Sequence, residues 1–192
     1  MRELMGAILA GGQSTRMGRD KAAIVLRDGR RMMDAVGEAL RQACGEFVIV
    51  GGTFAASNEN EPSANSIARL PDLRAGLGPM GGIEALLASN LAKEYIVSPC
   101  DLPLLTADAL RPLLQHRDTP ATVMRFAGGP QFEPLPARLS MAALPVVRRL
   151  LDEGHRSVWR LMQALPAAVV DVDDQHALAL RNVNTPEDLS TI

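Results

Sequence analysis

The stretch that decides the fold is "ILAGGQSTRMGRDKA", residues 8–22, in which an apolar run passes directly into a glycine-rich loop with positive charges. A short apolar run that ends in glycines is typical of a buried strand followed by a turn. In open α/β sheets, ligands bind where parallel strands end. Glycines let several backbone N–H groups approach one anion, and Arg16, Arg19 and Lys21 add positive charge. The stretch therefore predicts a first strand that leads into a phosphate site.

The spacing of the glycines excludes two common nucleotide motifs. The loop is neither a GxGxxG sequence that opens a helix nor a GxxxxGK[ST] sequence. Two interpretations of the residues remain open. The loop either binds a polyphosphate, which would relieve the repulsion among its cations, or it is a glycine-rich turn with a solvated basic face.

Working outward, the rest of the chain alternates short β-rich runs with segments long enough for a helix, which predicts parallel strands with crossover helices. The strand-like runs are "LMGAILAGG", "EFVIVGG", "EYIVSPCD", "ATVMRF" and "AAVVDVD". Helices are expected over 31–43, 80–92, 106–116, 140–153 and 156–165, and a last one begins at "TPEDL". Residues 54–66 are polar and are expected to form a mobile excursion. The sequence predicts an α/β fold in one domain, residues 1–192.

Composition narrows the class of protein. Hydrophobic residues make up 47% of the 192 residues and aromatic residues only 3%, which favours helices packed on a sheet. The net charge of -2 gives no general attraction to nucleic acid. The chain has two cysteines, Cys44 and Cys100, which indicates free thiols and a reducing cytoplasm, and no apolar run approaches the roughly 20 residues that span a bilayer. We expect a cytoplasmic protein that binds neither nucleic acid nor membrane.

Three downstream motifs carry further candidate site residues. In "YIVSPCDLPLL", Asp101 follows an apolar strand, where one carboxylate beside nucleotide phosphates suffices for Mg²⁺; the alternative is a turn residue. In "LPDLRAGLGPMGGI", residues 70–83, an acidic residue and several glycines precede a helix whose N–H groups would face a ligand; the alternative is a plain helix entry. In "RNVNTPEDL", Asn182 and Asn184 offer donors and acceptors, or simply form a turn before a capped helix.

Four motifs, in this order, resemble those of the molybdenum cofactor guanylyltransferases over residues 5 to 189. They are "LAGGxSxRMGxDK", the GPxxG loop, "PCDLP" and "NVNTPE". The resemblance implies a three-layer α/β/α sandwich with a mainly parallel, Rossmann-like sheet of the nucleotide-diphospho-sugar transferase type. It also implies transfer of GMP from GTP to the terminal phosphate of molybdopterin, with release of pyrophosphate. Receiving molybdoenzymes or their chaperones are implied as transient partners.

The resemblance also implies a role for each matching residue. Residues implied to bind GTP are Leu9, Ala10, Gly11, Gly12, Lys21, Asp72, Gly78, Gly82 and Asp101. Arg16 and Lys21 are implied at the triphosphate as catalytic groups, and Asp101 as the catalytic ligand of magnesium. Asn182 and Asn184, together with Arg156 in the acceptor-side segment 133–162, are expected near molybdopterin.

Two features keep alternatives open. Some family members have an asparagine after the second strand, where this chain has Gly51 or Gly52, so one side-chain contact to the base is missing. A cytidylyltransferase acting on the same pterin, or another small-molecule nucleotidyltransferase, is the nearest competitor, although "LAGG" and "DKA" favour guanine. A protein that binds nucleotide without turnover, as a regulator, is a hypothesis from another class.

Overall fold

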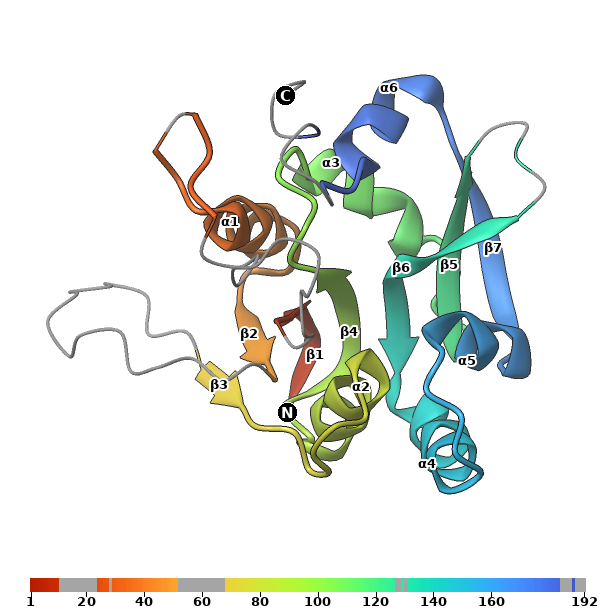
Figure 1. The fold of residues 1–192 in the computed structure, drawn as a ribbon. Helices are drawn as coiled ribbons and strands as arrows, with labels where there is room; N and C mark the ends of the chain where they lie inside the picture. Colours follow the sequence, from red (N-terminus) through yellow and green to blue (C-terminus); the bar gives the residue numbers. More distant parts are fainter. Residues whose placement is uncertain are drawn as a thin grey trace, which may run out of the picture.

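The fold centres on a seven-stranded sheet in the order β3-β2-β1-β4-β6-β5-β7 (Figure 1). The computed structural model describes residues 1–10, 24–27, 29–51, 68–126, 129, 131–183 and 188. The strands are β1 (Arg2–Leu9), β2 (Phe47–Val50), β3 (Ala68–Leu70), β4 (Ala92–Pro99), β5 (Ala121–Phe126), β6 (Phe132–Ser140) and β7 (Ala167–Val172). All neighbouring pairs are parallel except those of β6, which runs antiparallel to β4 and β5.

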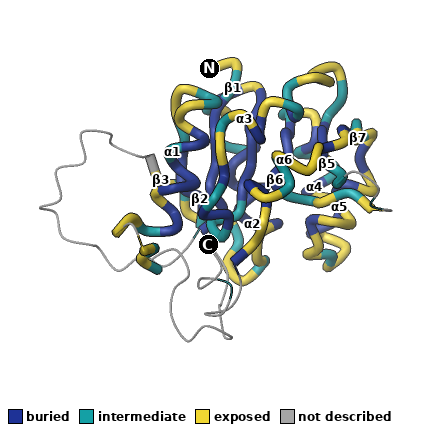
Figure 2. The backbone as a smooth tube through the Cα atoms, turned by 90° about the horizontal axis from the view of Figure 1, so that it is seen from above, coloured by how far each residue is buried: buried dark blue, intermediate teal, exposed yellow. Residues whose placement is uncertain are grey.

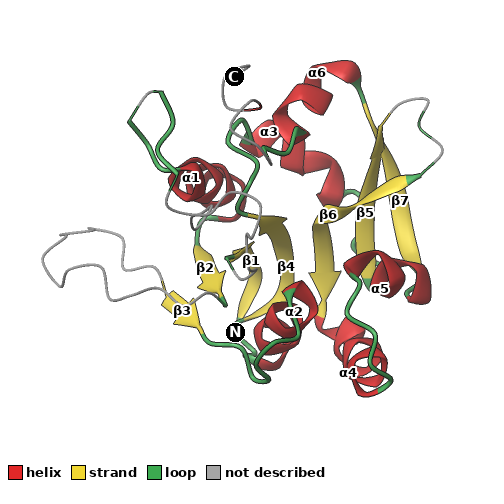
Figure 3. Cartoon of the chain, in the orientation of Figure 1, coloured by secondary structure: helices red, strands yellow, loops and turns green. Residues whose placement is uncertain are grey.

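Helices cover both faces of the sheet (Figures 1 and 3). One layer contains α1 (Met32–Cys44), α3 (Ala107–Leu110) and α6 (Asp174–Ala177), and the other contains α2 (Pro79–Ala88), α4 (Leu144–Asp152) and α5 (Val158–Ala164). Short 3-10 turns are η2 (Arg111–Leu114), η3 (Met141–Ala143) and η4 (Leu178–Leu180). This arrangement confirms the expected three-layer α/β/α sandwich. Within the ranges given above, no helix has the length and apolar character needed to cross a membrane.

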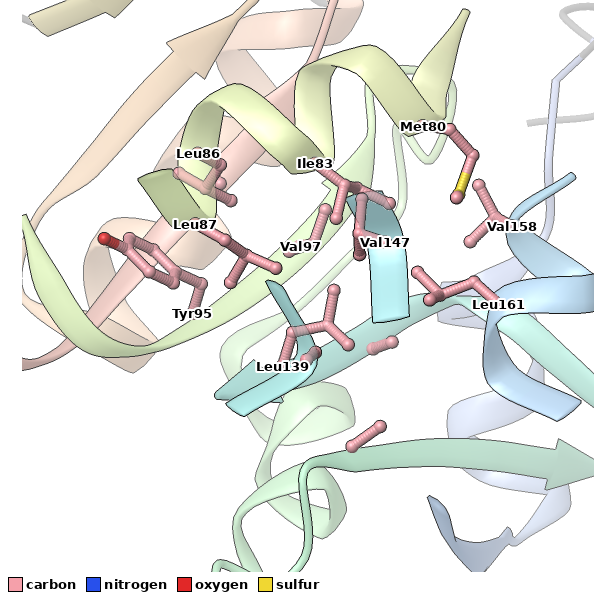
Figure 4. Close-up of a cluster of buried hydrophobic side chains, with 14 of the residues drawn as sticks. Met80, Ile83, Leu86, Leu87, Tyr95, Val97, Leu139, Val147, Val158 and Leu161 are labelled. Carbon is pink, nitrogen blue, oxygen red and sulfur yellow. The ribbon is translucent and has the colours of Figure 1, made fainter. Parts of the chain in front are cut away.

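Alternation along the strands produces two apolar cores. In β1, Ala7 and Leu9 face the layer of α2, whereas Ile8 faces the layer of α1. Since both faces of the strand are buried, it reads as a continuous apolar run, as expected for a covered parallel strand. Figure 4 shows Ile83 of α2 packed with Val97 of β4 in the first core. Figure 2 shows the buried strands enclosed by more exposed helices and turns.

The observed elements correct some of the sequence predictions. The runs expected to form β1, β2, β4, β5 and β7 do so, but β3 and β6 were missed. Pro134 and Pro136 argue against a central strand. They are accommodated because the ladder between β5 and β6 is interrupted there, with Met124 opposite Glu133 and Val123 opposite Ala137.

Helix ends also differ from expectation. The helix expected over 80–92 ends at Ala88, and Asn90 adopts a positive φ of 54° that α-helix does not permit. The helices expected over 106–116 and 140–153 are each part α-helix and part 3-10 helix. The polar segment 54–66 and the helix expected to begin at "TPEDL" lie outside the described residues, apart from residue 188.

A buried arginine ties the antiparallel strand β6 to its neighbours. Arg138 is completely buried, and its Nη2 donates hydrogen bonds to the carbonyl oxygens of His116 at 2.8 Å and Thr119 at 2.7 Å. Its Nε donates to Thr122 Oγ1, and its Nη1 lies 3.4 Å from Glu94 Oε1. Burial lowers the pKa of Arg138, and the nearby Glu94 carboxylate opposes that shift. The network therefore compensates a charge that would be costly to bury alone.

We expect Arg138→Gln to lower the free energy of unfolding by about 1–3 kcal/mol, because the Thr119 carbonyl loses its Arg138 donor and Glu94 keeps only its contact with Arg117 at 2.6 Å. Urea unfolding monitored by circular dichroism measures the change. Arg125→Gln is the matched control, because Arg125 of β5 forms an exposed pair at 2.7 Å with Asp171 of the adjacent strand β7. Its effect should be far smaller; equal losses for the two variants would contradict the importance of burial.

Candidate nucleotide-binding site

The chain changes direction across the sheet at β1. From β1 it continues through α1 to β2 on one side, and from β3 it returns through α2 to β4 on the other. The helices α1 and α2 lie on opposite faces (Figure 1). In open α/β sheets this reversal separates the loops that follow neighbouring strands, and ligands bind there. The carboxyl end of β1 is therefore the candidate ligand site.

Hydrogen bonds bring the strand ends into line at that edge. Leu9 lies opposite Val50 of β2 and Pro99 of β4. The Ala10 N–H donates to the Val50 carbonyl at 2.9 Å, and the Gly51 N–H donates to the Leu70 carbonyl at 3.0 Å. Four chain segments thus leave the sheet side by side.

Asp72 follows β3 by two residues and presents a buried acceptor. Its Oδ1 is buried and has no hydrogen-bond partner among the residues that the structure describes. Burial raises the pKa of this carboxyl above its ordinary value of 3.8. A buried oxygen of this kind is costly unless a donor reaches it, so Asp72 is suited to accept a hydrogen bond from a ligand.

Two glycines shape the backbone and the space around Asp72. Gly78 precedes α2 with φ 62° and ψ −152°, a region that only glycine adopts readily. A Cβ atom on Gly82 would lie 3.2 Å from Leu9 Cδ2, 3.4 Å from Val50 Cγ1 and 3.7 Å from Asp72 Oδ1. The structure therefore brings the predicted residues Leu9, Asp72 and Gly82 together.

Asp101 follows β4 by two residues and is joined to the C-terminal motif. The Val183 N–H donates to the Asp101 backbone carbonyl at 2.9 Å, and the Val183 side chain is buried. Asn182, the residue before Val183, is exposed. The predicted metal ligand and the first predicted asparagine therefore come from segments that are in direct contact.

Arg156 lies in the connection between α4 and α5, where its Nη1 donates to the Gly76 carbonyl at 3.0 Å. This contact places the exposed arginine against the loop that carries Asp72 and Gly78. Its expected role at molybdopterin stays a prediction. The next residue, Ser157, accepts a hydrogen bond from the Arg160 N–H and caps α5.

Sequence reasoning missed the charged residues that hold the loop 71–78. Arg74 forms a bidentate ion pair with Glu84 of α2 and a second ion pair with Asp152 of α4. A signal was present in the sequence: Glu84 is the one charged residue in the otherwise apolar helix "PMGGIEALLA". A charged side chain in such a helix is rarely buried without a partner.

Several predicted site residues cannot be placed. Gly11, Gly12, Arg16, Lys21 and Asn184 all lie outside the described residues, as does Gly52. Their roles stay predictions. In the parts that the structure does describe, no group of three or more His, Cys, Asp or Glu side chains could hold a metal ion. Asp101, a carboxylate just after β4, is the type of oxygen donor that Mg²⁺ prefers.

Comparison with known proteins gives a consistent result. The family described as "MobA-like NTP transferase domain" matches residues 6–169. The chain is similar to a "probable molybdenum cofactor guanylyltransferase" of Opitutus terrae, with 34% identity over 96% of this chain and 92% of that protein. It is also similar to the molybdenum cofactor guanylyltransferase of Xanthomonas euvesicatoria, with 33% identity over 97% of this chain and 93% of that protein. The resemblance inferred from the motifs is confirmed.

Solved structures share the fold. The molybdopterin-guanine dinucleotide biosynthesis protein A of Archaeoglobus fulgidus superposes with a TM-score of 0.76 at 24% identity, covering 97% of this chain and 95% of that one. Rv0371C of Mycobacterium tuberculosis, determined as a complex with manganese, has a TM-score of 0.65 at 21% identity, covering 99% of this chain and 97% of that one.

We expect Asp72→Asn to raise the melting temperature near pH 7, with a difference that shrinks as the pH falls toward about 4. Burial raises the pKa of Asp72, so charging this carboxyl costs stability as the pH rises above 3.8, and asparagine carries no such charge. Thermal unfolding at several pH values measures the effect.

Asp171→Asn is the control with the opposite sign. Its hydrogen bond to Arg125 lowers the pKa of Asp171, so the charged form stabilises the fold above pH 3.8 and that contribution disappears as the pH falls. Destabilisation of the protein by Asp72→Asn near pH 7 would contradict the assignment of Asp72 as an unsatisfied buried acceptor.

Proposed function

This chain belongs to the MobA-like NTP transferase domain family, and on that premise we propose that it transfers GMP from GTP to the terminal phosphate of molybdopterin. The products are pyrophosphate and the molybdopterin guanine dinucleotide. The observation that carries the proposal is that the strands before Ala10, Asp72 and Asp101 are in register and end at one edge of the sheet. It occurs in a chain whose relatives, similar over nearly their whole length, are named guanylyltransferases.

The guanosine part of GTP would bind between β1 and the start of α2. Leu9, Ala10, Gly11 and Gly12 would line the nucleotide with backbone groups. The buried Asp72 carboxylate would accept a hydrogen bond from the guanosine, which would satisfy the oxygen that has no partner among the described residues. Gly78 would allow the backbone turn before α2, and Gly82 would leave space next to Asp72.

In the reaction, an oxygen of the acceptor phosphate attacks the α-phosphorus of GTP, and the bond between the α-phosphorus and the bridging oxygen to the β-phosphate breaks. Pyrophosphate leaves with the electron pair of that bond. Since donor and acceptor are both anionic, positioning and charge neutralisation supply the catalysis. Arg16 and Lys21 would stabilise the negative charge that grows on the leaving group, and no covalent enzyme intermediate is required.

We further propose that Asp101 holds a magnesium ion together with the nucleotide phosphates. Its carboxylate is a hard oxygen donor at the end of β4, and Mg²⁺ commonly uses one or two such carboxylates plus phosphate oxygens. A bound divalent cation would neutralise charge on the phosphates. The manganese complex of the structurally similar Rv0371C supports a divalent metal in this fold.

On the acceptor side, we propose that Asn182 and Asn184 hydrogen-bond to molybdopterin and that Arg156 contributes positive charge near its phosphate. The contact between Val183 and Asp101 supports this arrangement, because it holds Asn182 beside the segment of the metal ligand. We also propose that the protein works in the cytoplasm, as a single domain, and meets molybdoenzymes or their chaperones transiently. Transfer of CMP to the same pterin is the second candidate, because Gly51 or Gly52 stands where some family members have an asparagine and one side-chain contact to the base is missing.

We expect pyrophosphate release only when GTP is supplied together with molybdopterin, in a panel of GTP, CTP, ATP and UTP at equal concentration. The physical reason is that a buried acceptor such as Asp72 discriminates by the donors that a base or sugar offers. A coupled phosphate assay measures release. Preference for CTP would replace the assignment by the cytidylyltransferase, and GTP binding without release would favour a non-catalytic regulator.

We expect Asp101→Ala to lower kcat by roughly 10² or more, the scale of losing one preorganised electrostatic group. Steady-state kinetics over a range of Mg²⁺ concentrations measure the loss. Asp108→Ala is the control and should keep its turnover, because Asp108 of α3 forms only an exposed pair with Arg111 at the start of η2. Turnover near that of the wild type in folded Asp101→Ala would reject its role as the metal ligand.

A further inference from the structure

The loop that carries Asp72, residues 71–78, is attached to two helices through one arginine. Arg74 Nε donates to Glu84 Oε2 at 2.8 Å, and its Nη2 donates to Glu84 Oε1 at 2.9 Å. Its Nη1 donates to Asp152 Oδ1 at 2.7 Å. A planar guanidinium that meets a carboxylate with two parallel hydrogen bonds fixes direction as well as distance. Arg74 therefore joins the loop to α2 and α4, which lie side by side (Figure 1).

The contact with Glu84 is the stronger of the two attachments. Glu84 is only 5% exposed, so its carboxylate needs a partner in place, and Arg148 is a more distant neighbour at 3.6 Å. Asp152 is exposed, and an exposed ion pair contributes little. The hydrogen bonds to Glu84 and Asp152 raise the pKa of Arg74, so the guanidinium stays charged at all relevant pH values.

The same helix turn that receives Arg74 also borders Asp72. A Cβ atom on Gly81 would lie 3.0 Å from Leu77 Cβ and 3.4 Å from the Arg74 carbonyl oxygen, so the loop packs directly on the start of α2. The neighbouring Gly82 faces Asp72 Oδ1. Asp72 and Arg74 are separated by a single residue, so the contacts of Arg74 act on the chain right next to Asp72.

A second attachment comes from the connection between α4 and α5, where Arg156 donates to the Gly76 carbonyl. The loop is thus held at two points, Arg74 and Gly76. This second bond involves a neutral backbone acceptor and an exposed arginine, so it is the weaker one. The orientation of the segment that contains Asp72 depends mainly on Arg74.

We propose that Arg74 is a positioning residue for nucleotide binding, which locks the loop 71–78 onto α2 and α4 and so holds the Asp72 carboxylate ready for the guanosine. The inference rests on the proposed binding of GTP at this edge of the sheet. Arg74 itself contacts no reacting group, because its guanidinium is occupied by Glu84 and Asp152. Its contribution is to keep the binding-competent conformation populated before the nucleotide arrives.

Arg74→Gln tests the proposal. When the competent conformation is only about one-tenth populated, the apparent Kd rises about tenfold. We expect calorimetry of the full-length protein to show that rise for Mg-GTP, and kinetics to show a similar rise in KM for GTP with kcat within about threefold of wild type. A purely structural role would instead lower the fraction of folded enzyme, which reduces the apparent kcat at unchanged KM.

Companion variants keep the test informative if Arg74→Gln folds poorly. Arg74→Lys retains the charge but loses the bidentate geometry, so its Kd for Mg-GTP should lie between those of the wild type and Arg74→Gln. In the double variant Arg74→Gln with Glu84→Gln, no buried carboxylate is left without its partner. That protein should regain stability while its Kd and KM for GTP remain raised.

The matched control is Arg41→Gln. Arg41 forms a similar bidentate pair with Glu38. This pair lies near the C-terminus of α1, which precedes the start of β2, and so it is remote from the carboxyl ends of the strands. Its Kd and KM for GTP should match the wild type. Unchanged Kd and KM in folded Arg74→Gln would overturn the positioning role. A wild-type protein that binds Mg-GTP but releases no pyrophosphate with molybdopterin would refute the proposed reaction and leave the binding test intact.

Discussion

The parallel pairing of β1 with β2 and β4 is the constraint on which the site depends. The register that places Leu9 opposite both Val50 and Pro99 makes the three strands end at the same level. Because apolar layers cover both faces of β1, a shift of one residue would turn Ile8 and Leu9 toward the wrong helices. Core packing therefore fixes the strand register, and with it the points along the sheet edge at which Ala10, Asp72 and Asp101 follow their strands. The positions of the candidate site residues depend on that register.

Around this scaffold, charge is distributed according to function. Arg138 and Glu84 are buried charged residues with partners supplied by the fold, and they hold strands and loops in place. Asp72 differs, because its buried oxygen has no partner among the described residues and its pKa is raised by burial. Natural sites often give up local stability in this way so that a ligand can supply the missing interaction. The contrast separates buried charges that hold the fold together from a buried carboxyl that is suited to accept a hydrogen bond from a ligand.

Much of the fold and part of the site could be predicted from the sequence, because both depend on local patterns. Apolar runs followed by glycine or aspartate identify the ends of β1 and β4, so the placement of Leu9 and Asp101 at one edge could be predicted. Asp72 was named only from its motif and the family resemblance, because the strand before it, β3, was missed. The strand β6 was missed because its prolines are tolerated only at an interruption that the partner strand β5 provides. The contacts of Arg74 with Asp152 and of Val183 with Asp101 link residues far apart in the chain, and no local pattern specifies them. The fold follows from local periodicity, whereas the way its loops are held depends on contacts between distant segments.

The hydrogen bond between Val183 and Asp101 joins a late segment of the chain to the end of β4. The last strand that the structure describes, β7, ends at Val172, so every described strand precedes Val183 in the chain. A chain cut after Leu180 would therefore keep the residues of all described strands but lose the backbone donor to the Asp101 carbonyl. The order of the sheet and the arrangement around Asp101 thus depend on different parts of the chain.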